Sequence, residues 1–210
     1  MKTFEPFVLD PWQCRKELDE LSARLGARDE PPEHLDFLPW FRHRKHLSAF
    51  VGAYFPYLAN PDQLAYEYDL FGDFRCDLAI GDSVSGEYCF VAFGDTRARD
   101  WPDRFDHGYG RILDWFWKLN DTRGTNESLR RFGPQYSGYQ GLLIAGSDAN
   151  LGGEEKKRLE WRREHIVADG KHVHCVTYDE LYRHLDLKLR LYEPAYRADL
   201  KQYSNRSTIL

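Results

Sequence analysis

The chain has 210 residues, of which 42% are hydrophobic and 15% aromatic, so it can form a sizeable core and does not have the composition of a disordered chain. Its 29 basic and 34 acidic residues give a net charge of −5, which excludes a protein that coats nucleic acid through bulk positive charge but leaves a local basic groove open. The four cysteines form no CxxC pair, which predicts reduced structural cysteines rather than a disulfide framework or a zinc site.

The N-terminal part of the chain reads as helical. A helix is predicted over 11–25, with Asp10 as its N-cap and Gly26 just past its end. A polar, proline-rich break at 27–33 is followed by a second helical region that reaches Tyr54. The first residues lack the apolar run of a signal peptide, and the longest uncharged run is too short and too broken by prolines to span a bilayer. We therefore expect a cytoplasmic protein with no membrane partner.

The middle of the chain reads as three short strands at 64–71, 74–82 and 87–94, and their short connections predict an antiparallel meander. The remaining expected elements are a helix at 107–120, a polar loop at 120–136, a strand at 141–145, a helix at 154–167, a strand at 173–177, a helix at 179–191 and a loosely held tail at 193–210. The predicted fold class is α/β, or α+β in stricter usage, with a mixed sheet flanked by helices.

The order α-β-β-β-α-β is that of the PD-(D/E)XK nuclease-like core. The successive segments FRCDLAIGD, EYCFVAFGDTR, HGYGRILDWFWKLND, GLLIAGS and HCVTYDELYRHL add a likeness in sequence. In this order and spacing the chain resembles the nuclease-type domain of the Shedu antiphage defence proteins, over roughly residues 45–190. The expected organisation is an N-terminal helical extension at 1–30, a nuclease-like domain at 31–192 and a C-terminal tail at 193–210.

The resemblance implies DNA as the partner and Mg²⁺ or Mn²⁺ as the cofactor of an active enzyme. In such nucleases an acid at the end of the second strand and a (D/E)-x-K motif on the third strand lie on one face, because strand side chains alternate. The acids hold the metal through oxygen ligands, and the metal activates water and polarises the scissile phosphate. By this resemblance Asp77 is the first acid and a metal ligand.

The (D/E)-x-K positions depart from the family pattern, because Ala92 and Gly94 stand there. Alanine cannot ligate a metal and glycine cannot supply an ammonium group, so catalysis by the standard route is in doubt. The domain is then a natural pseudonuclease, or Ala92 is an engineered inactivation, although Gly94 argues against that as the whole explanation.

A third explanation is an active set that has migrated to other positions. Each candidate also has a plain structural reading, as a turn residue or part of a solvated strand face. The migrated set would combine Asp77 with Glu67, Asp69 or Asp95 as acids and with Arg97 or Lys118 in the basic role.

Four basic residues are candidates for contact with nucleic acid. Arg97 follows the third strand, Arg111 lies on the next helix, and Arg44 and Lys45 belong to the basic run RHRKH. The alternative for each is a solvated surface. Two functions stay open, a degenerate nuclease-type domain that binds DNA and a non-catalytic protein-interaction or regulatory module on the same fold. Homo-oligomerisation also stays open.

Overall fold

The computed structural model describes residues 3–26, 37–58, 60–94 and 101–207. In chain order the elements are β1 (Glu5–Pro6), α1 (Pro11–Gly26), α2 (Phe37–Arg42), α3 (Lys45–Phe50), the 3₁₀ helix η2 (Val51–Tyr54), β2 (Gln63–Leu70), β3 (Phe74–Asp82), β4 (Glu87–Phe93), α4 (Trp101–Asp121), α5 (Asn126–Phe132), β5 (Gly138–Ile144), the 3₁₀ helix η3 (Asp148–Asn150), α6 (Gly153–His165), β6 (Val167–Ala168), β7 (Lys171–Val176) and α7 (Tyr178–Ser207).

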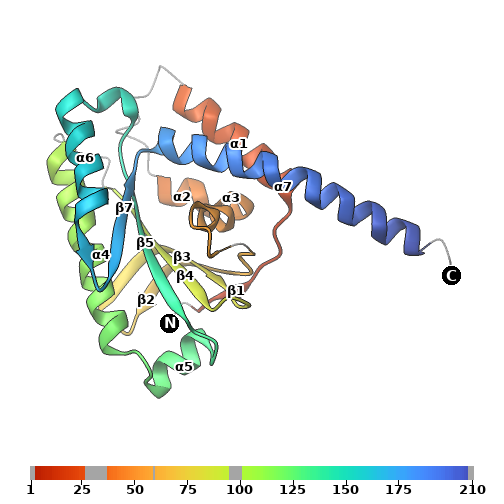
Figure 1. The fold of residues 1–210 in the computed structure, drawn as a ribbon, viewed down its shortest axis with the longest axis horizontal. Coiled ribbons are helices and arrows are strands. Elements are labelled where there is room, and N and C mark those ends of the chain that lie inside the picture. The colour runs from red at the N-terminus through yellow and green to blue at the C-terminus, as the bar shows by residue number, and fades with distance from the viewer. Residues whose placement is uncertain (1–2, 27–36, 59, 95–100, 208–210) are drawn as a thin grey trace.

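Within the described residues, a mixed sheet of seven strands has the order β1-β2-β3-β4-β5-β7-β6. The tight turns between β2, β3 and β4 enforce antiparallel pairing, as the sequence predicts, whereas β4, β5 and β7 run parallel. Helix α4 connects β4 to β5, and α6 lies between β5 and β7, so each parallel pair has a helical crossover (Figure 1). This is the α-β-β-β-α-β order of a nuclease-like core, and the expected α+β class is confirmed.

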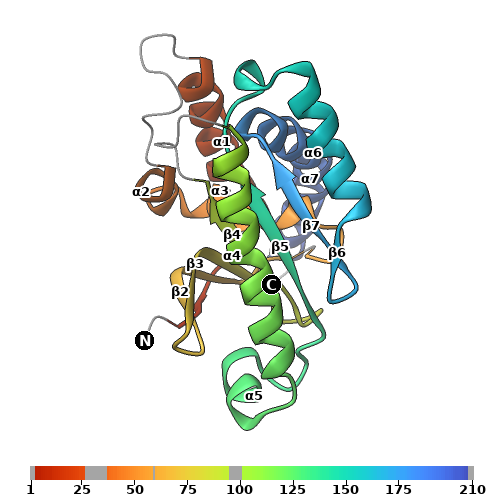
Figure 2. The ribbon, with the colours of Figure 1, turned by 90° about the vertical axis from the view of Figure 1, so that its left-hand side faces the viewer.

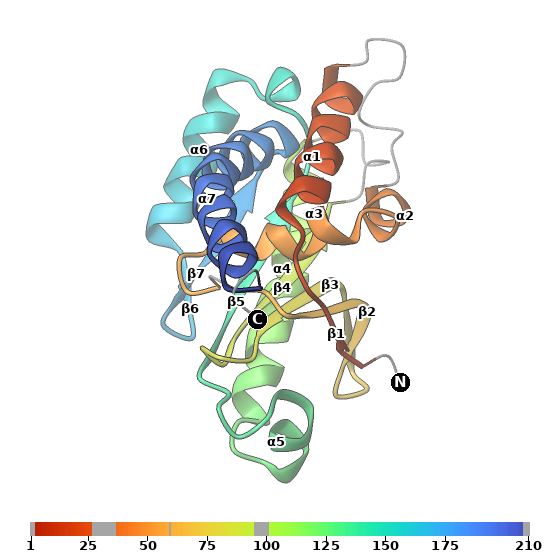
Figure 3. The same ribbon diagram turned by 90° about the vertical axis from the view of Figure 1, so that its right-hand side faces the viewer.

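Helices cover both faces of this sheet, and each face has its own apolar core. Figure 2 shows α4 and α6 in front of one face, and Figure 3 shows α1 and α7 in front of the other. The α4 face packs Phe90, Trp115 and Phe116, while the α7 face packs Val91 and Leu185. Successive residues of β4 therefore point into opposite cores, as a strand buried on both sides requires. Full burial of each such side chain contributes about 1.5–3 kcal/mol to the free energy of unfolding.

Helix α1 begins and ends where the sequence predicts. The Asp10 carboxylate accepts hydrogen bonds from the backbone N–H groups of Trp12, at 2.8 Å, and Gln13, at 3.4 Å, and so caps the helix. The second helical region differs from expectation because it is divided into α2, α3 and η2, with a break at residues 43–44.

Three further expectations need correction. The loop expected at 120–136 contains α5, which Thr125 caps by accepting a hydrogen bond from the Ser128 N–H at 3.2 Å. Helix α4 starts at Trp101, well before the expected start at 107. The backbone of α7 stays helical to Ser207 through most of the expected tail, and in Figure 1 this helix projects away from the sheet.

All four cysteines are buried free thiols. Burial raises the pKa of the thiols of Cys76, Cys89 and Cys175. Among the described residues, no helix combines the length and apolar character needed to cross a membrane.

Candidate functional site

The candidate site lies where β2 and β3 change faces of the sheet. Tyr66 packs into the core under α7, whereas Tyr68, two residues further along β2, is buried in the core under α4. The residue between them, Glu67, has a φ of 49°, a left-handed conformation that is unusual for a non-glycine residue and allows this reversal. Asp77 stands opposite Glu67 on β3, at the one position where the register between the two strands is interrupted. The chain therefore places two carboxylates at a break in the sheet.

Asp77 is held by an arginine and a backbone amide. Its Oδ2 accepts a hydrogen bond from the Phe93 N–H at 2.7 Å, and Arg111 on α4 donates to Oδ1 and Oδ2 at 2.8 and 3.2 Å. The same guanidinium donates to the Arg75 carbonyl at 3.2 Å and lies 5.3 Å from the centre of the Trp115 ring. The Asp77 and Arg111 side chains are only 18% and 29% exposed, so this two-pronged pair is partly shielded from water.

Glu67 is also paired with guanidinium groups. Arg42, at the end of α2, donates a hydrogen bond to Glu67 Oε2, and Arg75 approaches Glu67 Oε1 to within 3.8 Å. The Glu67 side chain is 28% exposed. Both carboxylates at the break thus have cationic partners from the protein itself, which neutralise the charge that would otherwise attract an external cation.

Packing closes the two positions at which the resemblance implies the (D/E)-x-K residues. Ala92 comes directly after the last residue of β4 that pairs with β3. It therefore lies beside Asp77, and its side chain is fully buried. At Gly94 a Cβ atom would come within 2.3 Å of the Ala145 Cβ, so no side chain fits there without a shift of the backbone. Phe93, between them, points to the other face and stacks on Phe41 with ring centroids 4.9 Å apart.

The side chains present here do not fit a divalent cation. Mg²⁺ and Mn²⁺ need several converging oxygen ligands. The carboxylates of Asp77 and Glu67 instead bind guanidinium groups, and Ala92 offers no donor atom. In the part of the chain that the structure describes, no group of three or more His, Cys, Asp or Glu side chains is placed to hold a metal ion. We derive no catalytic step through a metal from this arrangement.

Two other candidates of a migrated set, Asp69 and Lys118, pair with residues other than Asp77. Asp69 accepts a hydrogen bond from the Gly72 N–H at 3.1 Å, as a turn residue would, and its Oδ2 lies 3.5 Å from Arg131. Lys118 forms an ion pair with Asp73. Asp95 and Arg97 lie outside the described residues.

Basic residues of the run RHRKH, which spans the end of α2 and the start of α3, pair with acidic residues of other segments. The Arg44 Nε donates to Glu20 at 2.7 Å, and its guanidinium lies 3.9 Å from the centre of the Trp40 ring. Lys45 lies 3.5 Å from Glu5, and both of these side chains are exposed. Such an exposed pair is weak, so Lys45 remains available to a partner.

Sequence reasoning missed the two arginines that bind Glu67. Arg42 is the first residue of the basic run RHRKH, and Arg75 lies two residues before Asp77 on the same strand. Because side chains alternate along β3, Arg75 and Asp77 lie near one another, and this signal could have identified Arg75. Nothing in the local sequence indicates the approach of Arg42, because it comes from a helix 25 residues away from Glu67.

Comparison with known proteins supports the resemblance seen in the sequence. The family described as Shedu protein SduA, C-terminal, matches residues 32–182. No curated protein matches the chain. The family match covers well over half of the chain and includes the meander, α4, β5 and β7, which position Asp77 and Arg111. On this ground the chain belongs to the Shedu family of antiphage defence proteins, and residues 32–182 correspond to its C-terminal domain.

Proposed function

We propose that this chain is a non-cleaving nuclease-type domain that serves antiphage defence by binding or regulating rather than by cutting. The observation that carries the proposal is the ion pair between Asp77 and Arg111. The guanidinium takes both carboxylate oxygens of the residue that matches the metal-binding acid of the family. The burial of Ala92 and the close packing of Gly94 support the same conclusion, since neither position can supply the missing acid or lysine.

A cleavage assay tests the loss of catalysis. The purified chain is incubated with supercoiled plasmid and with linear DNA, in the presence of Mg²⁺ or Mn²⁺, beside an Asp77→Asn variant. We expect no difference between the two proteins and no cleavage above background. Cleavage by the unmodified chain that disappears in Asp77→Asn would show that an active set has migrated, and would overturn the proposal.

Metal binding gives a second readout that does not depend on finding the right substrate. Free Mn²⁺ has a strong electron paramagnetic resonance signal, which falls when the ion binds to protein. We expect the signal to be equal in the presence of the unmodified chain and of Asp77→Asn, because Arg111 already neutralises that carboxylate. A saturable loss of signal with the unmodified chain alone would contradict this reasoning.

DNA is the partner that the family resemblance implies, and salt dependence tests it. If basic side chains contact DNA phosphates, the logarithm of the association constant falls linearly with the logarithm of the salt concentration as counterions are released. The matched variants are Lys45→Ala, a predicted contact with a weak partner, and Lys157→Ala, an exposed lysine of α6. We expect Lys45→Ala to reduce the salt slope and Lys157→Ala to leave it unchanged.

The second candidate is a protein-interaction or regulatory module. It is favoured because two of the basic residues predicted to contact DNA are already paired with carboxylates. Arg44 and Arg111, two of the predicted contacts, each have a carboxylate within 2.8 Å, so their positive charge is already neutralised. Together with the net charge of −5, this reduces attraction to a polyanion. DNA binding that is absent even at about 50 mM salt would favour this candidate over the first.

A further inference from the structure

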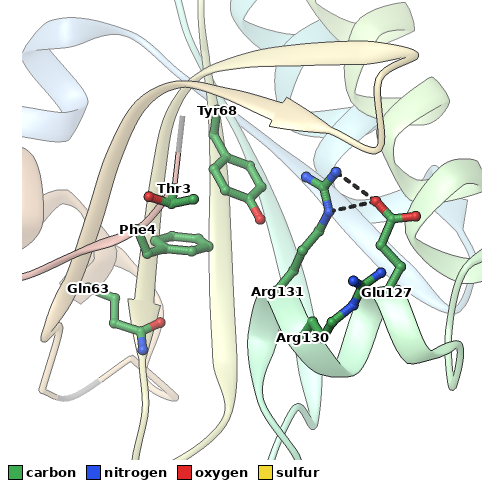
Figure 4. A pocket seen from close by; sticks show the side chains of 7 residues that line it. All are labelled: Thr3, Phe4, Gln63, Tyr68, Glu127, Arg130 and Arg131. Carbon is green, nitrogen blue, oxygen red and sulfur yellow. Dashed lines mark hydrogen bonds and ion pairs between the residues drawn. The ribbon is translucent and has the colours of Figure 1, made fainter. Parts of the chain in front are cut away.

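A cavity of about 620 Å³ lies between the start of the chain, β2 and α5, and its lining includes neither Asp77 nor Arg111. Its volume is in the range of sites that hold small molecules. Figure 4 shows aromatic and amide side chains from the N-terminal segment and β2 on one wall and charged side chains of α5 on the other. The lining residues are Thr3, Phe4, Gln63, Tyr68, Glu127, Arg130 and Arg131.

The first wall presents an aromatic ring beside an amide. The half-buried ring of Phe4 is held by Tyr68 and Tyr88, with ring centroids 4.6 and 5.3 Å away. The Tyr88 hydroxyl shares its single proton between the Phe132 carbonyl at 2.8 Å and Gln63 Oε1 at 3.0 Å, and the second contact orients the amide group. The amide nitrogen of Gln63 has no hydrogen-bond partner in the described part of the chain. This wall therefore offers a surface for stacking and a donor directed by a fixed side chain.

The second wall presents a carboxylate and two arginines. Arg131 is only 7% exposed, and it donates to Glu127 Oε1 at 2.8 Å and to the Asp69 carbonyl at 2.7 Å. These bonds hold Glu127 in place and leave its second oxygen, Oε2, able to accept from a ligand. Arg130 is exposed and forms no ion pair with any residue that the structure describes. Its guanidinium is thus the cation that a ligand anion can pair with most readily.

We propose that this cavity binds a free nucleoside monophosphate. The base stacks on Phe4, and the Gln63 amide donates to an acceptor on the base edge. A ribose hydroxyl donates to Glu127, as hydroxyl groups of ribose commonly do to carboxylates. The phosphate accepts from Arg130. A ligand with an aromatic base, a sugar with free hydroxyls and an anionic group uses the aromatic ring and amide of one wall and the carboxylate and exposed arginine of the other, whereas an inorganic anion would use Arg130 alone.

Isothermal titration calorimetry on the full chain tests the proposal. AMP, GMP, CMP and UMP are titrated in turn, each beside its 2′-deoxy form, inorganic phosphate and a short DNA oligonucleotide. The variants are Arg130→Ala and Phe4→Ala, and the matched control is Arg158→Ala, which removes an exposed arginine of α6. Arg130 is exposed, so its removal does not disturb the core even if Phe4→Ala alters folding.

The expected result is saturable binding of at least one ribonucleotide, weakened at least about tenfold in Arg130→Ala and unchanged in Arg158→Ala. Its deoxy form and inorganic phosphate should bind more weakly. The absence of saturable binding up to about 5 mM would overturn the proposal, as would unchanged affinity in Arg130→Ala. Equal affinity for inorganic phosphate would reduce the cavity to an anion site, and tighter binding of the oligonucleotide would assign it to a nucleic-acid strand. None of these outcomes depends on whether the chain cleaves DNA.

Discussion

Breaking the ion pair between Asp77 and Arg111 tests the central feature of the candidate site. Asp77→Asn keeps the shape of the side chain and an oxygen acceptor for the Phe93 N–H, but it removes the negative charge. Arg111→Leu removes the two guanidinium bonds to Asp77 and the bond to the Arg75 carbonyl, and it keeps an apolar side chain beside the Trp115 ring. The two single variants and the double variant together form a double-mutant cycle.

The magnitude follows from the burial of the pair. Exposed ion pairs contribute about 0–1 kcal/mol, and breaking a fully buried pair costs about 3–5 kcal/mol. The Asp77 and Arg111 side chains, at 18% and 29% exposure, lie between these limits, so we expect Arg111→Leu to lower the free energy of unfolding by about 2 kcal/mol. For a chain of this size that corresponds to a fall in Tm of roughly 4–8 °C.

Urea denaturation of all four proteins measures the coupling energy, which we expect to be at least about 1 kcal/mol. The control cycle uses Glu154 and Lys157 on α6, whose side chains are 91% and 74% exposed, and its coupling should not exceed about 0.5 kcal/mol. If the effects of Asp77→Asn and Arg111→Leu simply add, the guanidinium does not stabilise the carboxylate, and the reasoning that it takes the place of a metal is refuted.

The remaining predictions concern packing, pH and thiol reactivity. Gly94→Ala should lower the free energy of unfolding by about 1–3 kcal/mol in urea denaturation, because the added Cβ would overlap Ala145. Gly110 on α4 has open space around it, so Gly110→Ala should raise the free energy of unfolding by up to about 1 kcal/mol. Burial lowers the pKa of His174, so the unfolded chain binds its proton more tightly. Stability should therefore fall as the pH drops below about 6.5, and thermal melts of His174→Phe between pH 5 and 7 should show a shallower fall. Burial raises the pKa of Cys175 to about 12, so Ellman's reagent at pH 8 should react with this thiol only after urea is added.

The sequence was most informative where pattern and turn chemistry agree. The meander follows from three apolar runs joined by short polar turns, and α1 follows from Asp10 and Gly26 at its two ends. Helix α5 was missed although Thr125 stands at its N-cap and Gly133 follows it with a φ of 84°. Its seven residues show too little apolar periodicity to stand out from a polar loop.

The candidate site was predictable as a set of residues but not as a set of contacts. Asp77 and Arg111 could each be singled out from their places on a strand and on the following helix. Whether the arginine binds the acid or faces solvent depends on how α4 lies on the sheet, which no local pattern specifies. The reversal at Glu67 is less predictable still, because a positive φ at a glutamate runs against the conformational preference of that residue.

Under the proposed function, the departure from the nuclease pattern involves more than the side chains at positions 92 and 94. Restoring the acid at Ala92 would put a carboxylate into a fully buried position, and restoring the lysine at Gly94 would force a side chain against Ala145. Asp77 would still have to exchange its bonds with Arg111 for bonds to a metal. Each change opposes a contact that stabilises the fold. Two of these contacts involve α4 or Ala145, the residue after β5, rather than the strands β3 and β4. Under the proposed function, the packing between the sheet and α4 has therefore adapted to a site without a metal, and a simple reversal at positions 92 and 94 should destabilise the protein before it restores any activity.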